Sequence, residues 1–264
     1  MELETFKTLA LAREGRLLRA TFNRPEGLNA IDRATHAEFA RFLAELANDP
    51  LTDVVILSGA GRAFSAGGDL DHIQKMIDDP RLFLDDIPDV KRIVFGLLDC
   101  PKPIIAKLNG PAVGLGATIA LLCDVIFAAP SATIGDPHVK LGFVAGDGGA
   151  VIWPHLIGHA RAKEYLMTGR LLTAQEAERI GLINHLVAAA DLDRVVDEFA
   201  QELLGGAMRA IQWTKLCVNL GLKQLAQTVL DASVAYEALS NATADHQEAL
   251  RALRDKRAPR FTGR

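Results

Sequence analysis

Apolar positions in the first two thirds of the chain form two patterns, continuous runs and helical spacing, and these patterns predict different elements. Short continuous apolar runs have the length of buried strands, whereas one segment places its apolar residues at helical spacing. The runs are residues 17–22, 54–58, 103–108 and 125–129, and the helix-like segment is 35–46. Strand-like runs that lead into a helix predict stacked ββα units with parallel strands. The pattern therefore predicts an α/β fold for residues 1–190.

The pattern changes from residue 191 onward. The segments 191–204, 208–220 and 222–254 all have helical periodicity, and no strand-like run separates them. Because helices this apolar need a surface to cover, we expect residues 191–264 to pack over the preceding core. A second departure is the segment 71–88, which is rich in Asp and Pro and only weakly periodic. It predicts mobile helical turns rather than regular helices.

The composition describes an ordinary globular protein and argues against several function classes. The chain has 264 residues, 49% of them hydrophobic and 23% charged, with a formal net charge of −4. This charge gives no reason to expect nucleic acid as a partner, and no apolar run is long enough to span a membrane. Residues 1–12 lack the apolar core of a secretory signal, and the three cysteines lack C-x-x-C spacing. We therefore expect a cytoplasmic protein.

Two glycine-rich loops carry the strongest chemical signal. One spans residues 62–70 after a strand-like run, and the other spans residues 109–118 between such a run and an apolar helix. Loops of this kind aim free backbone N–H groups at a point where negative charge can be held. A dinucleotide fingerprint would need glycine at Ile119 and a P-loop would need it at Leu115, so neither fits. Close backbone packing explains one such loop equally well, but two favour an oxyanion hole.

Further motifs accompany the two loops through most of the chain. They lie at residues 22–25, 28–30, 63–69, 109–116, 123–126, 166–170, 174–177 and 181–183. In these residues the chain resembles the crotonase (enoyl-CoA hydratase/isomerase) family. The resemblance implies a crotonase-like spiral of ββα repeats, with a C-terminal helical region that covers the active site and forms trimers, often paired into hexamers. It also implies an acyl-CoA thioester substrate, with coenzyme A as part of that substrate and no separate cofactor.

The resemblance also implies roles for residues of both loops. The backbone N–H groups of Gly68 and Leu115 would donate to the thioester oxygen. Arg24 and the basic C-terminal tail are candidates for contact with the CoA phosphates, although a solvated helix end also accounts for the tail. Asp69 is expected to organise its loop rather than to react. The substrate-binding positions that the resemblance implies are Ala66, Gly67, Asp69, Gly114 and Thr118.

The two glutamates that hydratases of this family use are absent from this chain. Their positions fall on Thr118 and His138, and a threonine hydroxyl cannot act as a base at neutral pH. His138 and Asp147 are nine residues apart, and Asp147 lies in a glycine-rich turn. A carboxylate there either caps the helix that follows or faces a pocket, where burial would raise its pKa. Because this loop lines the acyl pocket in the family, we predict Asp147 as the acid/base and His138 as an assisting group.

The spacing of His138 and Asp147 also resembles the branch of the family that hydrolyses carbon–carbon bonds in β-diketones without CoA. The loop patterns at residues 67–69 and 114–116 are intact here, and they favour a thioester instead. A dehalogenase-like role for Asp147 as nucleophile would require a shift of one residue. Outside catalysis, the remaining alternative is an inert acyl-CoA-binding protein whose catalytic residues have been lost.

The other histidines give weaker signals. His155 and His159 have a spacing that could bind a metal on a helix, but Pro154 and Gly158 argue against a continuous helix. The glutamate of the zinc motif is also missing, so we expect no metal. His72 follows the first glycine-rich loop closely enough to approach an acyl group, but we favour a surface position on a helix for it.

Overall fold

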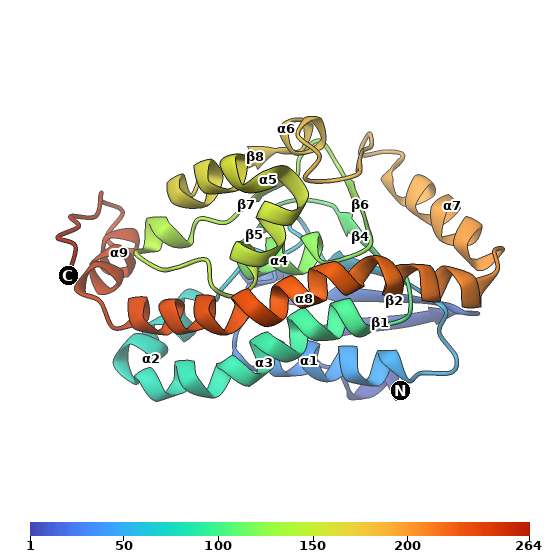
Figure 1. The fold of residues 1–264 in the computed structure, drawn as a ribbon, viewed down its shortest axis with the longest axis horizontal. Coiled ribbons are helices and arrows are strands. Elements are labelled where there is room, and N and C mark those ends of the chain that lie inside the picture. The colour runs from blue at the N-terminus through green and yellow to red at the C-terminus, as the bar shows by residue number, and fades with distance from the viewer.

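Two β-sheets form the centre of the computed structural model, which describes residues 1–264 (Figure 1). The larger sheet has the strand order β1-β2-β3-β4-β6-β9, and the smaller one has the order β5-β7-β8. In the larger sheet only the β1–β2 pair is antiparallel. The strands are β1 (Leu9–Glu14), β2 (Leu17–Phe22), β3 (Val54–Gly59), β4 (Ile104–Leu108), β5 (Ala112–Val113), β6 (Val125–Ala128), β7 (Thr133–Gly135), β8 (Leu172–Thr173) and β9 (His185–Leu186).

Helices surround both sheets and account for most of the second half of the chain. Short 3-10 turns are η1 (Leu3–Thr5), η2 (Pro25–Gly27) and η3 (His138–Leu141). The α-helices are α1 (Arg33–Ala47), α2 (Leu70–Asp78), α3 (Pro80–Asp99), α4 (Leu115–Leu121), α5 (Gly149–Thr168), α6 (Ala174–Arg179), α7 (Leu192–Leu204), α8 (Met208–Asn241) and α9 (Ala244–Arg254). No helix combines the length and the apolar character that a membrane span requires.

The chain winds through the two sheets in a repeating order. β4 joins the larger sheet, β5 joins the smaller sheet, and α4 follows; β6, β7 and α5 repeat the same order. A bridge between Ser65 and Ala112 links the segment after β3 to the smaller sheet, and this segment leads into α2. The predicted α/β fold of stacked ββα units is therefore confirmed. The repeat matters for the site because each turn brings a loop and a helix start to the same side.

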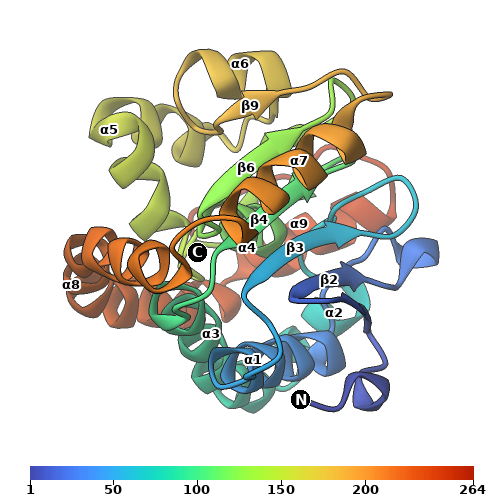
Figure 2. The same cartoon turned by 90° about the vertical axis from the view of Figure 1, so that its right-hand side faces the viewer.

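The side-chain alternation of β3 decides which helices cover the larger sheet. Val55 and Leu57 belong to the main hydrophobic core, whereas Val54 and Ile56 belong to a second core with Val196 of α7. Successive side chains of a strand point to opposite faces, so this short strand is buried on both sides. Figure 2 shows α7 lying across β3, β4 and β6, with α1 and α3 on the other side of the sheet.

The segment 71–88 forms regular helices, so the prediction of mobile turns is wrong. Asp69 and Asp79 accept hydrogen bonds from the first-turn N–H groups of α2 and α3. Pro80 occupies the first turn of α3, where its missing N–H has no intrahelical partner to lose. Part of the Asp and Pro content that suggested irregular structure is therefore a set of helix-start signals. Pro88 lies inside α3 without ending it.

The C-terminal helices divide at a different residue from the one predicted. α8 continues through Gly221, and the break comes at Ala242 and Thr243, where the Thr243 side chain caps α9. In Figure 1 α8 runs the length of the molecule beside α3, and it packs against α3 and α5. These helices therefore lie over the preceding core, as the sequence indicated. A domain boundary at residue 190 stays a prediction.

Candidate active site

A cavity of about 370 Å³ lies where both glycine-rich loops, α2, α3 and the segment after β7 meet. Its volume falls within the range of small-molecule sites, and much of its wall is apolar. Polar side chains interrupt the apolar wall at Asp32, His36, His72, Asp86, His138, Lys140, Asp147 and Glu237. The cavity therefore offers an apolar surface together with titratable groups.

The two glycine-rich loops touch each other at the cavity wall. A Cβ atom on Gly67, whose φ is +86°, would lie 2.7 Å from the carbonyl oxygen of Val113. Gly114 has a φ of +54°, and a Cβ atom there would lie 3.5 Å from Cε1 of His138. Gly67 is required both by its positive φ and by the close Val113 carbonyl, whereas Gly114 is favoured by its positive φ alone.

Two backbone N–H groups at this junction have no acceptor within the chain. The neighbouring N–H groups of Ala66, Gly67 and Gly114 all donate to protein oxygens. The N–H of Gly68 makes no such bond, and Leu115 is the first residue of α4, where no intrahelical acceptor exists. Both residues line the cavity. A ligand oxygen there can accept hydrogen bonds that the protein itself leaves unmade.

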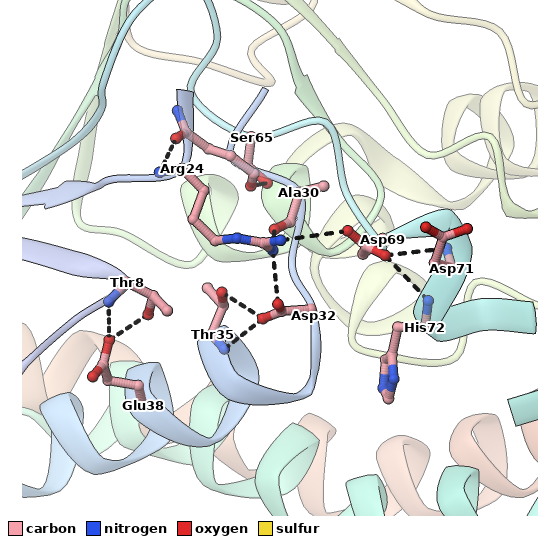
Figure 3. Close-up of polar contacts among 11 residues, drawn as sticks. Thr8, Arg24, Ala30, Asp32, Thr35, Glu38, Ser65, Asp69, Asp71 and His72 are labelled. Atoms are coloured by element: carbon pink, nitrogen blue, oxygen red, sulfur yellow. Dashed lines mark hydrogen bonds and ion pairs between the residues drawn. The ribbon is translucent and has the colours of Figure 1, made fainter. Parts of the chain in front are cut away.

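Asp69 and Arg24 hold the first loop against the start of α1 (Figure 3). The Asp69 carboxylate accepts hydrogen bonds from backbone N–H groups in the first turn of α2. Nη1 of Arg24 lies 3.0 Å from Asp32 and donates to the Ala30 carbonyl at 2.8 Å, and Nη2 lies 3.6 Å from Asp69. Arg24 thus has carboxylate partners and is outside the cavity wall. Its contact with a CoA phosphate stays a prediction.

Two arginines of the basic C-terminal tail also have acidic partners. Arg254 lies 2.9 Å from Asp71 at the start of α2, and Arg257 lies 2.6 Å from Glu248. The first pair links α9 to α2, the helix that follows the first glycine-rich loop. Because these ion pairs are exposed, each contributes little to stability, and both arginines remain within reach of solvent.

His138 lies between two carboxylates in a buried part of the cavity wall. Its Nδ1 is hydrogen-bonded to Oδ1 of Asp136, and its Nε2 lies 3.6 Å from Oδ2 of Asp147. The same Asp136 oxygen accepts the backbone N–H of His138 at 3.3 Å. The structure therefore brings together the two residues singled out in the sequence, and it adds Asp136, which the sequence analysis did not select.

Thr118 lies behind Asp147 rather than in the cavity. Its hydroxyl donates to Oδ1 of Asp147 at 3.4 Å, and it is fully buried without lining the cavity. Gly148 is the N-cap of α5, and the Asp147 carboxylate is close enough to the first-turn N–H of Gly149 for this group to lower its pKa. Thr118 thus helps to orient the carboxylate, and a direct contact with substrate stays a prediction.

Burial and charge give His138 and Asp147 unusual pKa values. Burial by itself would lower the pKa of His138, but the charges of Asp136 and Asp147 outweigh it and raise the pKa to about 10. Burial raises the pKa of Asp147 to about 6, against the opposing effect of the His138 cation. At neutral pH the histidine is therefore an imidazolium and Asp147 is mainly a carboxylate. A base with this pKa is suited to proton transfer near neutral pH.

Comparison with known sequences decides the family. The sequence model of the enoyl-CoA hydratase/isomerase family matches residues 13–264. The chain belongs to this family. A short-chain-enoyl-CoA hydratase of Clostridium acetobutylicum is 34% identical, over 94% of this chain and 94% of the relative. A 1,2-epoxyphenylacetyl-CoA isomerase of Escherichia coli is 33% identical, over 92% of this chain and 94% of the relative.

Solved structures agree with the sequence comparison. An enoyl-CoA hydratase/isomerase from Mycobacterium paratuberculosis superimposes with a TM-score of 0.89 at 36% sequence identity. The match covers 92% of this chain and 97% of that structure. The crotonase-like fold and the membership in an enzyme family are therefore established. The relatives carry both hydratase and isomerase names, so the family alone leaves the reaction open.

In this enoyl-CoA hydratase/isomerase family member, Glu237 of α8 adds a further carboxyl to the group around His138. The Glu237 side chain is buried, lines the cavity and leaves Oε2 without a hydrogen-bond partner. Burial, reinforced by the charge of Asp147, raises the pKa of Glu237 well above its ordinary value. A Cβ atom on Gly146 would lie 2.7 Å from Cβ of Glu237, so this glycine lets α8 approach. We call Asp136, His138, Asp147 and Glu237 the proton-transfer cluster.

The sequence contained one signal for Glu237 that the analysis did not use. The buried residues of α8 include Leu230, Val234 and Asn241, which recur at helical spacing. Glu237 falls on the same stripe, and an acidic residue at a core position is rarely buried without a partner or a function. The spacing could therefore have marked Glu237 as unusual, although it could not say what the side chain faces.

The ligand atoms of Asp136, His138 and Asp147 lie within 4.8 Å of one another, close enough to consider a metal ion. Nδ1 of His138 is already hydrogen-bonded directly to Asp136, and a cation between them would have to replace that proton. The nitrogen and oxygen atoms that could bind a metal ion are also close enough to exchange protons with one another. The expectation that this chain uses no metal stays a prediction.

The other histidines considered in the sequence analysis differ in their exposure. His72 lines the cavity, with its side chain 14% exposed, so the surface position considered for it is wrong. His155 and His159 are exposed on α5, and the backbone at Gly158 is non-helical with a φ of 76°. That kink interrupts the helical spacing on which a metal site at these two residues would depend.

Proposed function

We propose that this chain is an acyl-CoA enzyme that stabilises the enolate of a thioester and moves protons at the adjacent carbons. The observation that carries the proposal is one cavity lined both by the free N–H groups of Gly68 and Leu115 and by the His138–Asp147 pair. Hydration and isomerisation of an enoyl thioester both pass through such an enolate. The family membership supports the thioester as substrate, and no cofactor beyond the substrate's coenzyme A is proposed.

In this proposal, Gly68 and Leu115 form the oxyanion hole. Their N–H groups donate to the thioester oxygen, and the N-terminal end of α4 adds its positive dipole. Negative charge grows on this oxygen as the enolate forms, so these bonds are stronger in the transition state than in the ground state. Loss of one such donor typically lowers the rate by about 100-fold or more. Ala66, Gly67 and Gly114 hold the donors in position.

Asp147 then serves as the acid/base at the α-carbon. As a carboxylate it removes a proton, and in its protonated form it returns one, while the neighbouring His138 cation stabilises the charged state. Asp136 keeps His138 protonated and oriented. Burial raises the pKa of Glu237, so its carboxyl beside this pair holds a proton more readily than an exposed glutamate would. A single base with a pKa of about 6 is sufficient for a 1,3-proton shift in an enoyl thioester.

A second candidate is hydrolysis of a carbon–carbon bond in a β-diketone. The direct approach of His138 to Asp147 favours it, because such a pair can activate water and deliver a proton. A diketone hydrolase has no need to bind coenzyme A, whereas an acyl-CoA enzyme does. Affinity for CoA and for a saturated acyl-CoA, measured by calorimetry, therefore separates the two candidates.

We further propose a cytoplasmic homotrimer or a hexamer made of two trimers. The family resemblance supports the assembly, and exposed apolar side chains on α8 give it a surface: Trp213, Val218, Leu220, Tyr236 and Leu239. The unpaired cysteines, Cys100, Cys123 and Cys217, suit a reducing compartment. Sedimentation analysis of the purified chain distinguishes the monomer, trimer and hexamer by mass.

The decisive experiment measures thioester turnover with crotonyl-CoA, with a longer 2-enoyl-CoA and with the 3-enoyl isomer of the latter. Loss of the enoyl absorbance reports hydration, and its appearance from the 3-enoyl substrate reports isomerisation. We expect turnover by the unmodified enzyme that disappears in Asp147→Asn, while Asp193→Asn, a change at an exposed aspartate, preserves it. Acyl-CoA binding without any turnover would instead identify an inert binding protein.

A further inference from the structure

A second polar group lies in the wall of the same cavity, and the proposed reaction does not use it. His36 comes from α1, His72 from α2 and Asp86 from α3, and all three line the cavity. We call these residues together with Arg33 the distal cluster. The surrounding wall is apolar, so a plain hydrocarbon chain would have no use for an ionised carboxylate and two imidazoles at this point.

The contacts within the distal cluster fix the orientation of His72. Its Nε2 lies 2.7 Å from Oδ2 of Asp86, and the other oxygen of Asp86 contacts Arg33. Because Asp86 accepts from both neighbours, Nε2 of His72 carries the proton in this bond. Figure 3 shows the His72 ring pointing away from the Asp69 carboxylate that caps its helix. Nδ1 of His72 is left without a partner in the chain.

His36 is the second group with an unmade hydrogen bond. Only 5% of the residue is exposed, and its Nδ1 is buried without a hydrogen-bond partner. Burial lowers its pKa, so the ring is neutral at physiological pH and carries one donor and one acceptor. Nδ1 is shielded from the cavity, so Nε2 is the ring atom whose hydrogen bond a bound molecule can complete.

The charges around the cluster show which kind of ligand group fits. Arg33 contacts Asp86 and lies 3.5 Å from Asp89, and Arg92 lies 2.7 Å from Asp89. Two cations and two anions thus balance, and the nearby Asp32 has Arg24 as its partner. None of these arginines and aspartates is left unpaired to attract a carboxylate, a phosphate or an ammonium group. The ligand group is therefore neutral and polar.

A hydroxyl fits this arrangement better than a carbonyl does. Nδ1 of His72 and Nε2 of His36 have no hydrogen-bond partner in the chain, and a histidine nitrogen donates or accepts according to its protonation. A hydroxyl both donates and accepts, so it can pair with these nitrogens whichever of them carries a proton, whereas a carbonyl only accepts. We propose that the distal cluster binds a hydroxyl on the acyl chain, beyond the reacting carbons. The enzyme would thereby select hydroxylated acyl-CoA thioesters, an inference that rests on the proposed function.

The test compares terminally hydroxylated 2-enoyl-CoA thioesters with deoxy thioesters of the same chain lengths. We expect kcat/KM to be at least about tenfold higher for the best hydroxylated member, because its deoxy counterpart leaves the imidazoles unpaired. In His72→Phe and in His36→Phe this ratio falls to about one. His155→Phe is the matched control on an exposed histidine, and it keeps both the activity and the ratio.

The outcomes separate this inference from the proposed function. Turnover of both series without any preference overturns the inference and leaves the proposed function intact. If neither series is turned over, the proposed function fails, and calorimetry with the saturated hydroxylated and deoxy acyl-CoA thioesters then decides the inference. A binding preference that disappears in both histidine variants supports it, and equal affinities overturn it. If one histidine variant fails to fold, the other variant and the unmodified protein still test the preference for hydroxylated substrates.

Discussion

The proton-transfer cluster and the distal cluster contain the same kinds of side chains in one cavity, yet the pKa values of their aspartates are shifted in opposite directions. Each joins a histidine to a buried aspartate. Burial acts to raise the pKa of Asp86, but the hydrogen bond from His72 and the neighbouring charges outweigh it and hold the pKa below its ordinary value. Burial of Asp147 prevails instead, and its pKa rises to about 6.

The two clusters also differ in the kind of positive charge that contacts their carboxyls. Arg33 contacts Asp86, and an arginine supplies a positive charge that is permanent at any physiological pH. No lysine or arginine forms an ion pair with Asp136, Asp147 or Glu237, so only His138 and additional protons can balance these three carboxyls. Where protons neutralise the carboxyls, the cluster can exchange those protons with a substrate. Where an arginine neutralises them, the ion pair holds the side chains in a fixed arrangement. The two clusters therefore suit reaction and binding respectively.

The largest expected effect compares Asp147→Asn with Asp86→Asn. The first change removes the proposed base and lowers kcat by about 10²- to 10⁴-fold, the usual contribution of a general acid/base. The second disturbs the orientation of His72 and acts mainly through KM for hydroxylated substrates. Steady-state kinetics on both variants measure this split. Equal losses of kcat in the two variants would erase the functional distinction between the clusters.

A somewhat smaller loss is expected in Gly67→Ala, which changes the junction of the two glycine-rich loops. Gly67 has a φ of +86°, and the new Cβ atom would lie 2.7 Å from the carbonyl oxygen of Val113. The two glycine-rich loops would therefore have to separate. We expect kcat to fall by about 10- to 100-fold, part of the contribution of a correctly positioned oxyanion hole. Gly181→Ala is the control, because its φ is +80° and no atom lies within 4 Å. Similar losses in both variants would assign the effect to backbone strain alone.

The pH dependence gives the next smaller effect. Asp147 acts as a base only when ionised, so kcat/KM should fall as the pH drops through about 6. The cation of His138 opposes the rise in this pKa, so His138→Gln should move the acid limb to higher pH. Asp86→Asn should leave the midpoint where it is. A limb that stays at the same pH in His138→Gln would contradict the coupling between the two residues.

The smallest effect concerns stability and Glu237. Its folded-state pKa is raised, so the protein loses stability as the pH rises above the unfolded value towards the folded one. Glu237→Gln removes this loss, and we expect its melting temperature at pH 8 to exceed that of the unmodified protein by roughly 2 to 4 °C for each kcal/mol regained. At pH 4 the difference should vanish. A lower melting temperature at pH 8 would show that Glu237 is ionised and paired.

The sequence predicted those parts of the molecule that depend on local patterns. Apolar runs identified the strands β2, β3, β4 and β6, and the glycine positions identified the loops that meet at Gly67 and Gly114. The nine-residue spacing of His138 and Asp147 singled out a pair that the fold brings within 3.6 Å. Each of these signals is contained in one segment of the chain, which is why reading the chain could find it.

The remaining features depend on contacts between distant segments or on signals with two meanings. Glu237 reaches the cluster only because α8 crosses the core, and its own segment does not reveal what that helix faces. Asp79 and Pro80 suggested irregular structure, yet together they begin α3. The pairing of His72 with Asp86 joins two helices whose packing no local period describes. Tertiary contacts decided the positions of Glu237 and His72, whereas the start of α3 depended on a local signal with two meanings.

The most direct test of the central claim measures deuterium exchange at the α-carbon of a saturated acyl-CoA in D₂O. A saturated thioester cannot be hydrated or isomerised, so exchange reports enolate formation alone. We predict that the unmodified enzyme incorporates deuterium at this carbon, that Asp147→Asn slows incorporation by at least about 100-fold, and that Asp193→Asn does not. Binding of the acyl-CoA without any exchange, or undiminished exchange in Asp147→Asn, would contradict the account.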